Sequence, residues 1–252
     1  MNTKPHDNML IIVCGMREPD NIRDVDALDI DLMGFIFYPK SSRYVEMISS
    51  HAGIMPDYSA ERLQTSMSRH QKDSGNGAAP HRHPRVGVFV DDMPQNIVTR
   101  IYNYKLDYIQ LHGDESAVMI DNLRRTVADG IAPAIKIIKA IPVATEADID
   151  RAAQYDGVAD MLLFDTNSAT RGGSGQQFCW QWLDRYRGTT PFLLSGGIGP
   201  DDADKVLQIK HDKMAGIDIN SRFETAPGVK DVERLKRFIT KIRQHEQDKH
   251  TL

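Results

Sequence analysis

The chain has 252 residues, of which 40% are hydrophobic and 26% charged, a composition typical of a globular protein with a core of useful size. Its net charge of −4 excludes an overall basic field for nucleic acid or an anionic membrane, and no apolar run reaches the roughly 20 residues that cross a bilayer. Two distant cysteines, Cys14 and Cys179, indicate neither a disulfide framework nor a zinc site, and with the short polar N-terminus they lead us to expect a cytoplasmic protein.

Short apolar runs bounded by Gly, Pro or Asp recur along the whole chain, and we predict a strand at each. Compact runs rich in Val, Ile, Leu and Phe are typical of parallel strands that are buried on both faces. The predicted strands are Met9–Cys14, Leu32–Phe37, Arg85–Val90, Tyr108–Leu111, Ala134–Lys139, Met161–Asp165, Pro191–Ser195 and Ala215–Ile219.

Helices are expected after most of these strands. Pro19 and Pro94 stand where a first helical turn begins, a position that tolerates the missing N–H. Thr145 and Asp148 form a capping-box pattern, and apolar residues recur at helical spacing over 232–242.

Eight strands with intervening helices predict a single α/β domain over 1–252, a (β/α)8 TIM barrel of eight parallel strands. Periodicity alone leaves a doubly wound open sheet as the competing arrangement. Residues 59–84 break the pattern, since they are rich in Gly, Ser, His and Pro, and we expect a flexible insertion there between the second helix and the third strand. His81 and His83 within it are expected to be solvated and to bind no metal.

Polar residues follow the ends of several predicted strands, where the active site of a TIM barrel lies. They include Cys14, Arg43, His112, Asp165 and Asp218. A thiol and a carboxylate that face each other across a barrel mouth could remove and supply a proton, which is what isomerisation of a sugar needs without a redox cofactor.

Each of these residues also has a structural interpretation. Free Cys14 could be a small core residue, and His112 a satisfied core histidine. Asp165 and Asp218 could be helix caps or salt-bridge partners. For Cys179, beside two tryptophans on an expected helix, packing is the preferred interpretation.

Three glycine-containing or polar loops after the sixth, seventh and eighth strands are candidates for phosphate binding. Glycine lets backbone N–H groups approach an anion, and TIM barrels often bind phosphate after strands seven and eight. The candidate residues are Gly173, Gly175, Gly196, Gly197, Asn220 and Ser221.

The chain resembles phosphoribosylanthranilate isomerases along nearly all its length, the insertion being the main exception. The resemblance lies in the order of VCGMRE (13–18), MGFIFYPKSSRYV (33–45), VGVFVD (86–91), DYIQLHGDE (107–115), LFDT (163–166), RGGSGQQF (171–178), PFLLSGGI (191–198) and GIDINSRFETAPGVKD (216–231). It implies a cytoplasmic enzyme of tryptophan biosynthesis that works without a cofactor or metal. It also implies a small phosphorylated substrate as its partner, no nucleic acid or membrane, and a monomer or homodimer.

The reaction that the resemblance implies is the Amadori rearrangement of N-(5-phosphoribosyl)anthranilate to 1-(2-carboxyphenylamino)-1-deoxyribulose 5-phosphate. In this comparison Cys14 falls on the family's general base and Asp165 on its general acid. Arg43 falls on the contact to the anthranilate carboxylate, while His112 and Asp218 fall on positions that line the substrate site. A thiolate base requires a lowered pKa, which cationic neighbours would favour.

The chain departs from the family pattern at three places. Ile12 stands where the family usually has lysine, two residues before the cysteine, which removes a charge that could tune the thiol. Gln176 and Gln177 replace lysine and threonine, and Arg222 follows Asn220-Ser221 where a glycine is usual, so we expect the phosphate contacts to differ in detail from those of the family. A different phosphosugar isomerase that uses two aspartates, like the ProFAR isomerase, and a non-catalytic phosphosugar-binding barrel are the alternatives.

Overall fold

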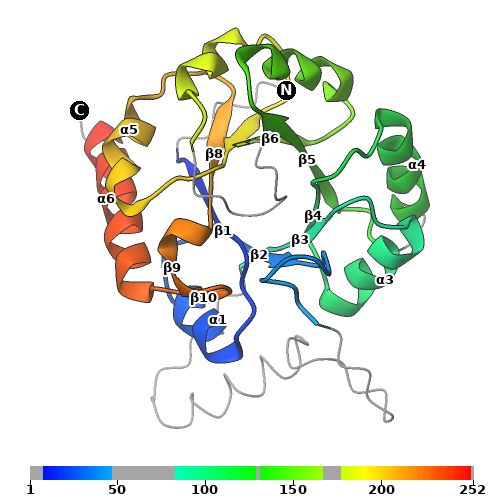
Figure 1. Ribbon diagram of the computed structural model, residues 1–252, viewed down its shortest axis with the longest axis horizontal. Coiled ribbons are helices and arrows are strands. Elements are labelled where there is room, and N and C mark those ends of the chain that lie inside the picture. The colour runs from blue at the N-terminus through cyan, green and yellow to red at the C-terminus, as the bar shows by residue number, and fades with distance from the viewer. Residues whose placement is uncertain (1–7, 47–82, 129–130, 167–176, 251–252) are drawn as a thin grey trace.

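The structure is a computed structural model that describes residues 8–46, 83–128, 131–166 and 177–250. Eight parallel strands close into a barrel in chain order (Figure 1). They are β1 (Leu10–Val13), β2 (Leu32–Ile36), β3 (Arg85–Phe89), β4 (Tyr108–Leu111), β5 (Lys136–Val143), β6 (Met161–Thr166), β7 (Phe192–Leu194) and β8 (Met214–Ile219). Because β1 pairs with β8, no edge is left open. The predicted TIM barrel is confirmed, and the open sheet is excluded.

Helices surround the barrel in the same order (Figure 1). They are α1 (Pro19–Asp26), α3 (Pro94–Tyr104), α4 (Ala117–Ala128), α5 (Ala203–Gln208) and α6 (Val232–His250), with the 3-10 segments η1 (Glu146–Tyr155), η2 (Trp180–Arg185), η3 (Pro200–Asp202) and η4 (Ser221–Phe223). The predicted starts at Pro19 and Pro94 are confirmed, and so is the Thr145–Asp148 capping box, although the helix behind it is a 3-10 helix. A small antiparallel hairpin, β9 (Glu224–Ala226) and β10 (Val229–Lys230), follows β8.

Two apolar layers hold the barrel together. One lies between the strands and the helices and is the larger. The other fills the barrel interior with residues such as Ile12, Leu163 and Leu193. Because side chains alternate along a strand, the residues two positions further on, Cys14 and Asp165 among them, also face inward, at the carboxyl end of the barrel. The apolar interior is therefore the floor of the site.

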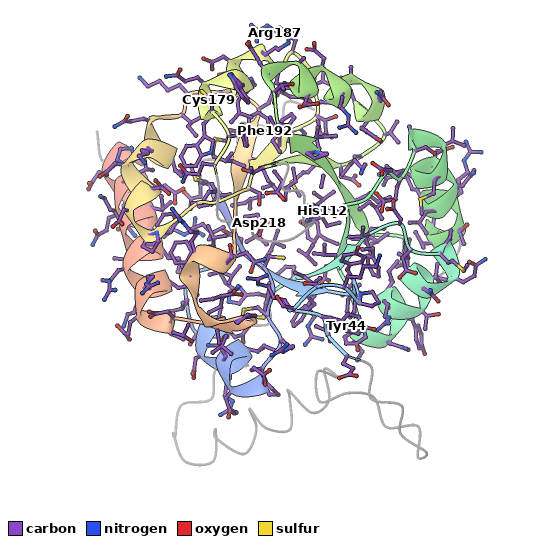
Figure 2. The ribbon with its side chains drawn as sticks, viewed as in Figure 1. Tyr44, His112, Cys179, Arg187, Phe192 and Asp218 are labelled. Carbon is purple, nitrogen blue, oxygen red and sulfur yellow. The ribbon has the colours of Figure 1, made fainter. Side chains whose placement is uncertain are left out.

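Four details differ from the sequence predictions or fall outside the described residues. The fifth strand covers Lys136–Val143 and so lies further along the chain than the predicted Ala134–Lys139, since Pro142 sits within the strand and does not end it. Cys179 is exposed at the start of η2, so the prediction that it packs in the core is wrong (Figure 2). His83 is only 16% exposed and its ring contacts the Asp26 carbonyl, so it is not simply solvated. Most of the predicted insertion lies outside the described residues.

Among the described helices, none is both long and apolar enough to span a membrane.

Candidate active site

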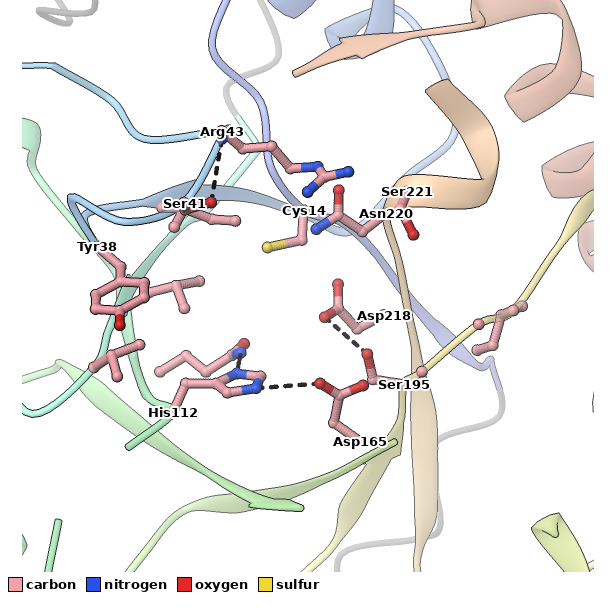
Figure 3. A pocket seen from close by; sticks show the side chains of 17 residues that line it. Cys14, Tyr38, Ser41, Arg43, His112, Asp165, Ser195, Asp218, Asn220 and Ser221 are labelled. Atoms are coloured by element: carbon pink, nitrogen blue, oxygen red, sulfur yellow. Dashed lines mark hydrogen bonds and ion pairs between the residues drawn. The ribbon is translucent and has the colours of Figure 1, made fainter. Parts of the chain in front are cut away.

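A pocket opens at the carboxyl ends of the strands and collects side chains from most of the barrel (Figure 3). Its lining residues from the sequence prediction are Cys14, Arg43, His112, Asp165, Gly196, Gly197, Asp218, Asn220 and Ser221. Cys14, directly after β1, and Asp165 from β6 lie on facing walls, with Asp218 between them on one side (Figure 3). Gly173 and Gly175 lie outside the described residues.

On the Asp165 side of the pocket, hydrogen bonds link side chains at the ends of β4 and β6. The Gln110 amide lies 2.8 Å from His112 Nδ1, and His112 Nε2 lies 3.2 Å from Asp165 Oδ2 (Figure 3). If the amide N–H of Gln110 donates to Nδ1, the imidazole proton sits on Nε2 and donates to the carboxylate. His112 and Asp165 remain 28% and 24% exposed, so both reach the space that a ligand would fill.

Cys14 lies on the opposite wall and is almost fully buried, at 4% exposure. Gly34 on β2 makes room for it, since a Cβ there would approach the thiol sulfur to 2.7 Å. Burial raises the pKa of the Cys14 thiol well above its ordinary value, and Asp218 adds to this; Lys230, the Gly15 N–H and Arg43 act in the other direction. The cations expected from the sequence are therefore present, but the lowered pKa is not found, because burial outweighs them.

Asp218 on β8 is a buried carboxyl group with little to stabilise its charge. Its Oδ2 lies 3.4 Å from Ser195 Oγ, and its Oδ1 has no hydrogen-bond partner. Burial, with Asp165 adding to it, raises the pKa of Asp218 to about 7. Ile12 is its neighbour in the β1–β8 register. A lysine at residue 12 would lie beside Asp218. The isoleucine found here therefore removes a positive charge next to Asp218, before any effect on Cys14.

Arg43 reaches the same pocket from the segment after β2, where it is held by an ion pair. Its Nε lies 2.9 Å and 3.0 Å from the two carboxylate oxygens of Glu224, and its Nη2 lies 2.7 Å from Oε2. Lys230 Nζ donates to the same carboxylate, at 2.7 Å from Glu224 Oε1, and also to Asn220 Oδ1 at 2.6 Å. The three side chains are 10%, 5% and 0% exposed, so this is a buried network directly behind the pocket wall.

The predicted phosphate side lies after β7 and β8. Gly196 and Gly197 both adopt positive φ, at 87° and 73°, a conformation that favours glycine. Gln177 donates to the Gly197 carbonyl at 2.9 Å, so it supports the loop. Arg222 is exposed in η4, immediately after the pocket residues Asn220 and Ser221.

A family model and a known relative both identify the family of this chain. The family model described as N-(5'phosphoribosyl)anthranilate (PRA) isomerase matches residues 37–241. An N-(5'-phosphoribosyl)anthranilate isomerase of Parabacteroides distasonis is 42% identical over 234 residues, which is 93% of each chain. The chain belongs to the N-(5'-phosphoribosyl)anthranilate isomerase family.

Solved structures of the family agree with the fold. A phosphoribosyl anthranilate isomerase from Thermotoga maritima has a TM-score of 0.68 and 28% identity, with 94% of this chain and 99% of that one covered. A second, with the same identity and coverage and a TM-score of 0.64, is a complex with reduced 1-(o-carboxyphenylamino)-1-deoxyribulose 5-phosphate. The predicted family and activity, an isomerase of tryptophan biosynthesis, are confirmed.

The isomerase pocket contains residues to which sequence reasoning gave no role. Gln110 and Ser195 stand in the predicted strand ends and line the pocket. Glu224 and Lys230 lie in the last motif that carries the resemblance, but on the hairpin after the final strand, where nothing predicted a path back to Arg43. The one available signal was a glutamate and a lysine in a segment that follows a strand end.

Proposed function

We propose that Cys14 is the general base and Asp165 the general acid in the isomerisation of N-(5-phosphoribosyl)anthranilate to 1-(2-carboxyphenylamino)-1-deoxyribulose 5-phosphate. The observation that carries this assignment is that a thiol at the end of β1 and a carboxyl group from β6 share one pocket and face each other across it. A base and an acid on opposite sides of a sugar can move two protons without a redox cofactor.

In the first step Asp165 gives a proton to the ring oxygen of the ribose, and the C1–O bond breaks to leave an open-chain iminium ion. The Nε2–H of His112, 3.2 Å from Asp165 Oδ2, donates a hydrogen bond that holds the carboxyl group in place for this transfer. In the second step the Cys14 thiolate removes the proton on C2, and the electron pair of that C–H bond forms the C1–C2 double bond of an enolamine. Protonation at C1 and loss of the hydroxyl proton at C2 then give the ketone.

The buried thiol of Cys14 must ionise before the second step. An iminium cation beside it would favour the thiolate, in the same direction as Lys230 and Arg43. Asp218 lines the same pocket, burial raises its pKa to about 7, and we assign it to accept the thiol proton. Protonation of Asp218 also removes its repulsion of the thiolate, so the two changes support each other.

The two ends of the substrate are assigned to different residues of the pocket. Arg43 faces the anthranilate carboxylate, a task suited to its planar fork of donors. The phosphate is assigned to the loops with Gly173, Gly175, Gly196, Gly197, Asn220 and Ser221. The positive φ of Gly196 and Gly197 supports this, since glycine lets backbone N–H groups approach an anion closely. We place the enzyme in the cytoplasm as one domain over 1–252, as a monomer or homodimer.

The test is a fluorescence assay that follows consumption of phosphoribosylanthranilate by the purified chain, with Cys14→Ala and Asp165→Asn beside it. Loss of acid–base catalysis should lower kcat by at least ~100-fold in each variant. Cys179→Ser, at the exposed cysteine, is the matched control and should keep wild-type turnover. Turnover near the wild-type rate in either site variant would refute the role given to that residue.

A further inference from the structure

The ion-pair network behind Cys14 contains more positive than negative charge. We call Arg43, Glu224 and Lys230 the Glu224 cluster. Two cations share one carboxylate in it, and the three side chains are no more than 10% exposed. Asn220, the next group bonded to Lys230, is neutral. The cluster therefore carries one surplus positive charge when all three groups are ionised.

A surplus charge in a buried place needs a counterion, because low-dielectric surroundings penalise an unbalanced charge. Among the described residues, two acidic groups besides Glu224 interact with Lys230, the thiol of Cys14 and the carboxyl group of Asp218. Burial raises the pKa of both groups, that of Asp218 to about 7, so neither is a full counterion at neutral pH. Burial lowers the pKa of Lys230, Glu224 opposes this, and the charge on Arg43 adds to the lowering. An incoming anion would relieve the repulsion between the two cations.

The geometry of Arg43 shows where such an anion would sit. Glu224 occupies the edge of the guanidinium formed by Nε and Nη2. Among the described residues, Nη1 has no hydrogen-bond partner, so the second edge, formed by Nη1 and Nη2, keeps free donors. Since Arg43 lines the pocket, this edge matches the bidentate geometry of a carboxylate.

We propose that Glu224 and Lys230 are positioning residues for the substrate's aromatic carboxylate. Glu224 holds one edge of Arg43 so that the other faces the pocket, and Lys230 supplies the positive charge that Glu224 would otherwise cancel. This inference rests on the proposed role of Arg43 and adds the two residues that set its orientation and its net charge.

The alternative is that the cluster only joins the hairpin to the barrel. Part of the hairpin's attachment is independent of the charges, since the Asn21 side chain of α1 bonds both the N–H and the carbonyl of Lys230, at 2.6 Å and 2.9 Å. Replacing the ammonium group therefore leaves this backbone contact in place.

The experiment compares equilibrium binding of two compounds. One is reduced 1-(o-carboxyphenylamino)-1-deoxyribulose 5-phosphate, and the other is the same compound without the ring carboxylate. Charge-assisted hydrogen bonds from Arg43 should give the wild-type chain about 10- to 100-fold preference for the first. Lys230→Met should lose most of this preference while its affinity for the second compound stays within about twofold.

Two further variants separate charge from structure. Glu224→Gln with Lys230→Met removes one charge of each sign, restores the surplus, and should recover at least part of the preference that Lys230→Met alone loses. Arg43→Lys keeps the charge but loses the fork, and should lose the preference. Lys241→Met, at an exposed ion pair with Asp204, is the control and should bind as the wild type does.

Equal loss of affinity for both compounds in Lys230→Met, with no recovery in the double variant, would overturn the proposal in favour of a structural role. An unchanged preference in Lys230→Met would overturn it as well, since the surplus charge would then have no effect. The assays of the Cys14 and Asp165 variants do not depend on these results, so the acid–base assignment can stand if this inference fails. Thermal unfolding of each variant shows whether it is folded.

Discussion

The two halves of the pocket are each supported by a buried lysine–glutamate pair, but the pairs differ in charge balance. On the acid side, Lys139 of β5 lies 3.1 Å from Glu115, and the side chains are 2% and 3% exposed. On the base side, Lys230 lies 2.7 Å from Glu224, which also binds Arg43. The first pair is neutral, whereas the second carries one surplus positive charge.

The neutral pair is directed at backbone. Lys139 Nζ donates to the carbonyls of Leu111 and Gly113, the two residues that flank His112. Glu115 accepts the N–H groups of Gly113 and Asp91. Every donor of the ammonium is used within the protein, so this pair fixes the β4 loop that carries His112. The charged cluster instead leaves donors free toward the pocket. In this protein the neutral Lys139–Glu115 pair thus stabilises a loop, whereas the Glu224 cluster keeps charge and donors available for a ligand.

The largest expected effect comes from breaking the balanced pair. Lys139→Met leaves a buried Glu115 carboxylate without its cation, and removal of one partner from a buried pair costs about 3–5 kcal/mol of unfolding free energy. Lys230→Met should cost less, because Glu224 keeps Arg43 as a partner. Urea unfolding of both variants measures this difference.

The double variant Lys139→Met, Glu115→Gln is the control for this prediction. It removes the stranded charge and should regain part of the lost stability, as neutral replacements of buried pairs do. A Lys230→Met variant that is destabilised as strongly as Lys139→Met would contradict the distinction between a structural pair and a ligand-binding cluster.

Much of the fold followed from the sequence because its signals are local. Apolar runs such as Arg85–Val90 and Tyr108–Leu111 identify buried strands wherever they occur, and the position of a residue at a strand end is enough to place it at the barrel mouth. The fifth strand was predicted to end at Lys139. It continues to Val143, because the carbonyls of the neighbouring loop and Glu115 satisfy that lysine.

The network behind the pocket was not predictable in the same way. Arg43 and Glu224 are 181 positions apart, and neither a period nor a motif joins them. The pKa of the Cys14 thiol could not be predicted either, because sequence shows which cations are available but not how deeply Cys14 is buried. Burial and long-range pairing are properties of the closed barrel and appear only in three dimensions.

Asp218 lies between the two halves and gives the next prediction. Its folded pKa of about 7 is above the usual value for an aspartate, so the native state binds more protons than the unfolded state between about pH 4 and pH 7. Its contribution to stability is therefore complete below that window and is lost as pH rises through it. One pKa unit corresponds to about 1.4 kcal/mol, so Asp218→Asn should gain up to about 4 kcal/mol relative to wild type on going from pH 4 to pH 8.

Unfolding free energies at several pH values from 4 to 8 measure this gain. Asp156→Asn is the matched control, because hydrogen bonds from Thr190 and Thr189 lower the pKa of Asp156 to about 2. Its stabilising effect is present above pH 4 and is lost only as pH falls toward 2, so that variant should differ from wild type by a constant amount over most of the same range. If the Asp218 variant also runs parallel to wild type, the buried carboxyl group has no raised pKa.

On the acid side, His112 should act through the orientation of Asp165. His112→Ala removes the Nε2 contact at 3.2 Å and should lower kcat by roughly 10- to 100-fold, the scale of a misplaced catalytic group. His112→Gln places an amide donor near the Nε2 position and should be impaired less. Steady-state kinetics of both variants decide the matter. If the two lose the same activity, the donor to Asp165 is not what His112 supplies.

The smallest expected effect is on the reactivity of Cys14. This effect compares the cations of the base side directly with Asp218. Lys230 and Arg43 lower the pKa of this thiol and Asp218 raises it. Lys230→Met should therefore slow alkylation of Cys14 by iodoacetamide at a fixed pH, and Asp218→Asn should speed it, because the thiolate is the reacting form. The measurement uses mass spectrometry of the Cys14 peptide in a Cys179→Ser background, since Cys179 is exposed and would react first. Changes of the same sign in both variants would point to a change in access to the buried thiol, and the charges on the two sides of Cys14 would then not be what sets its ionisation.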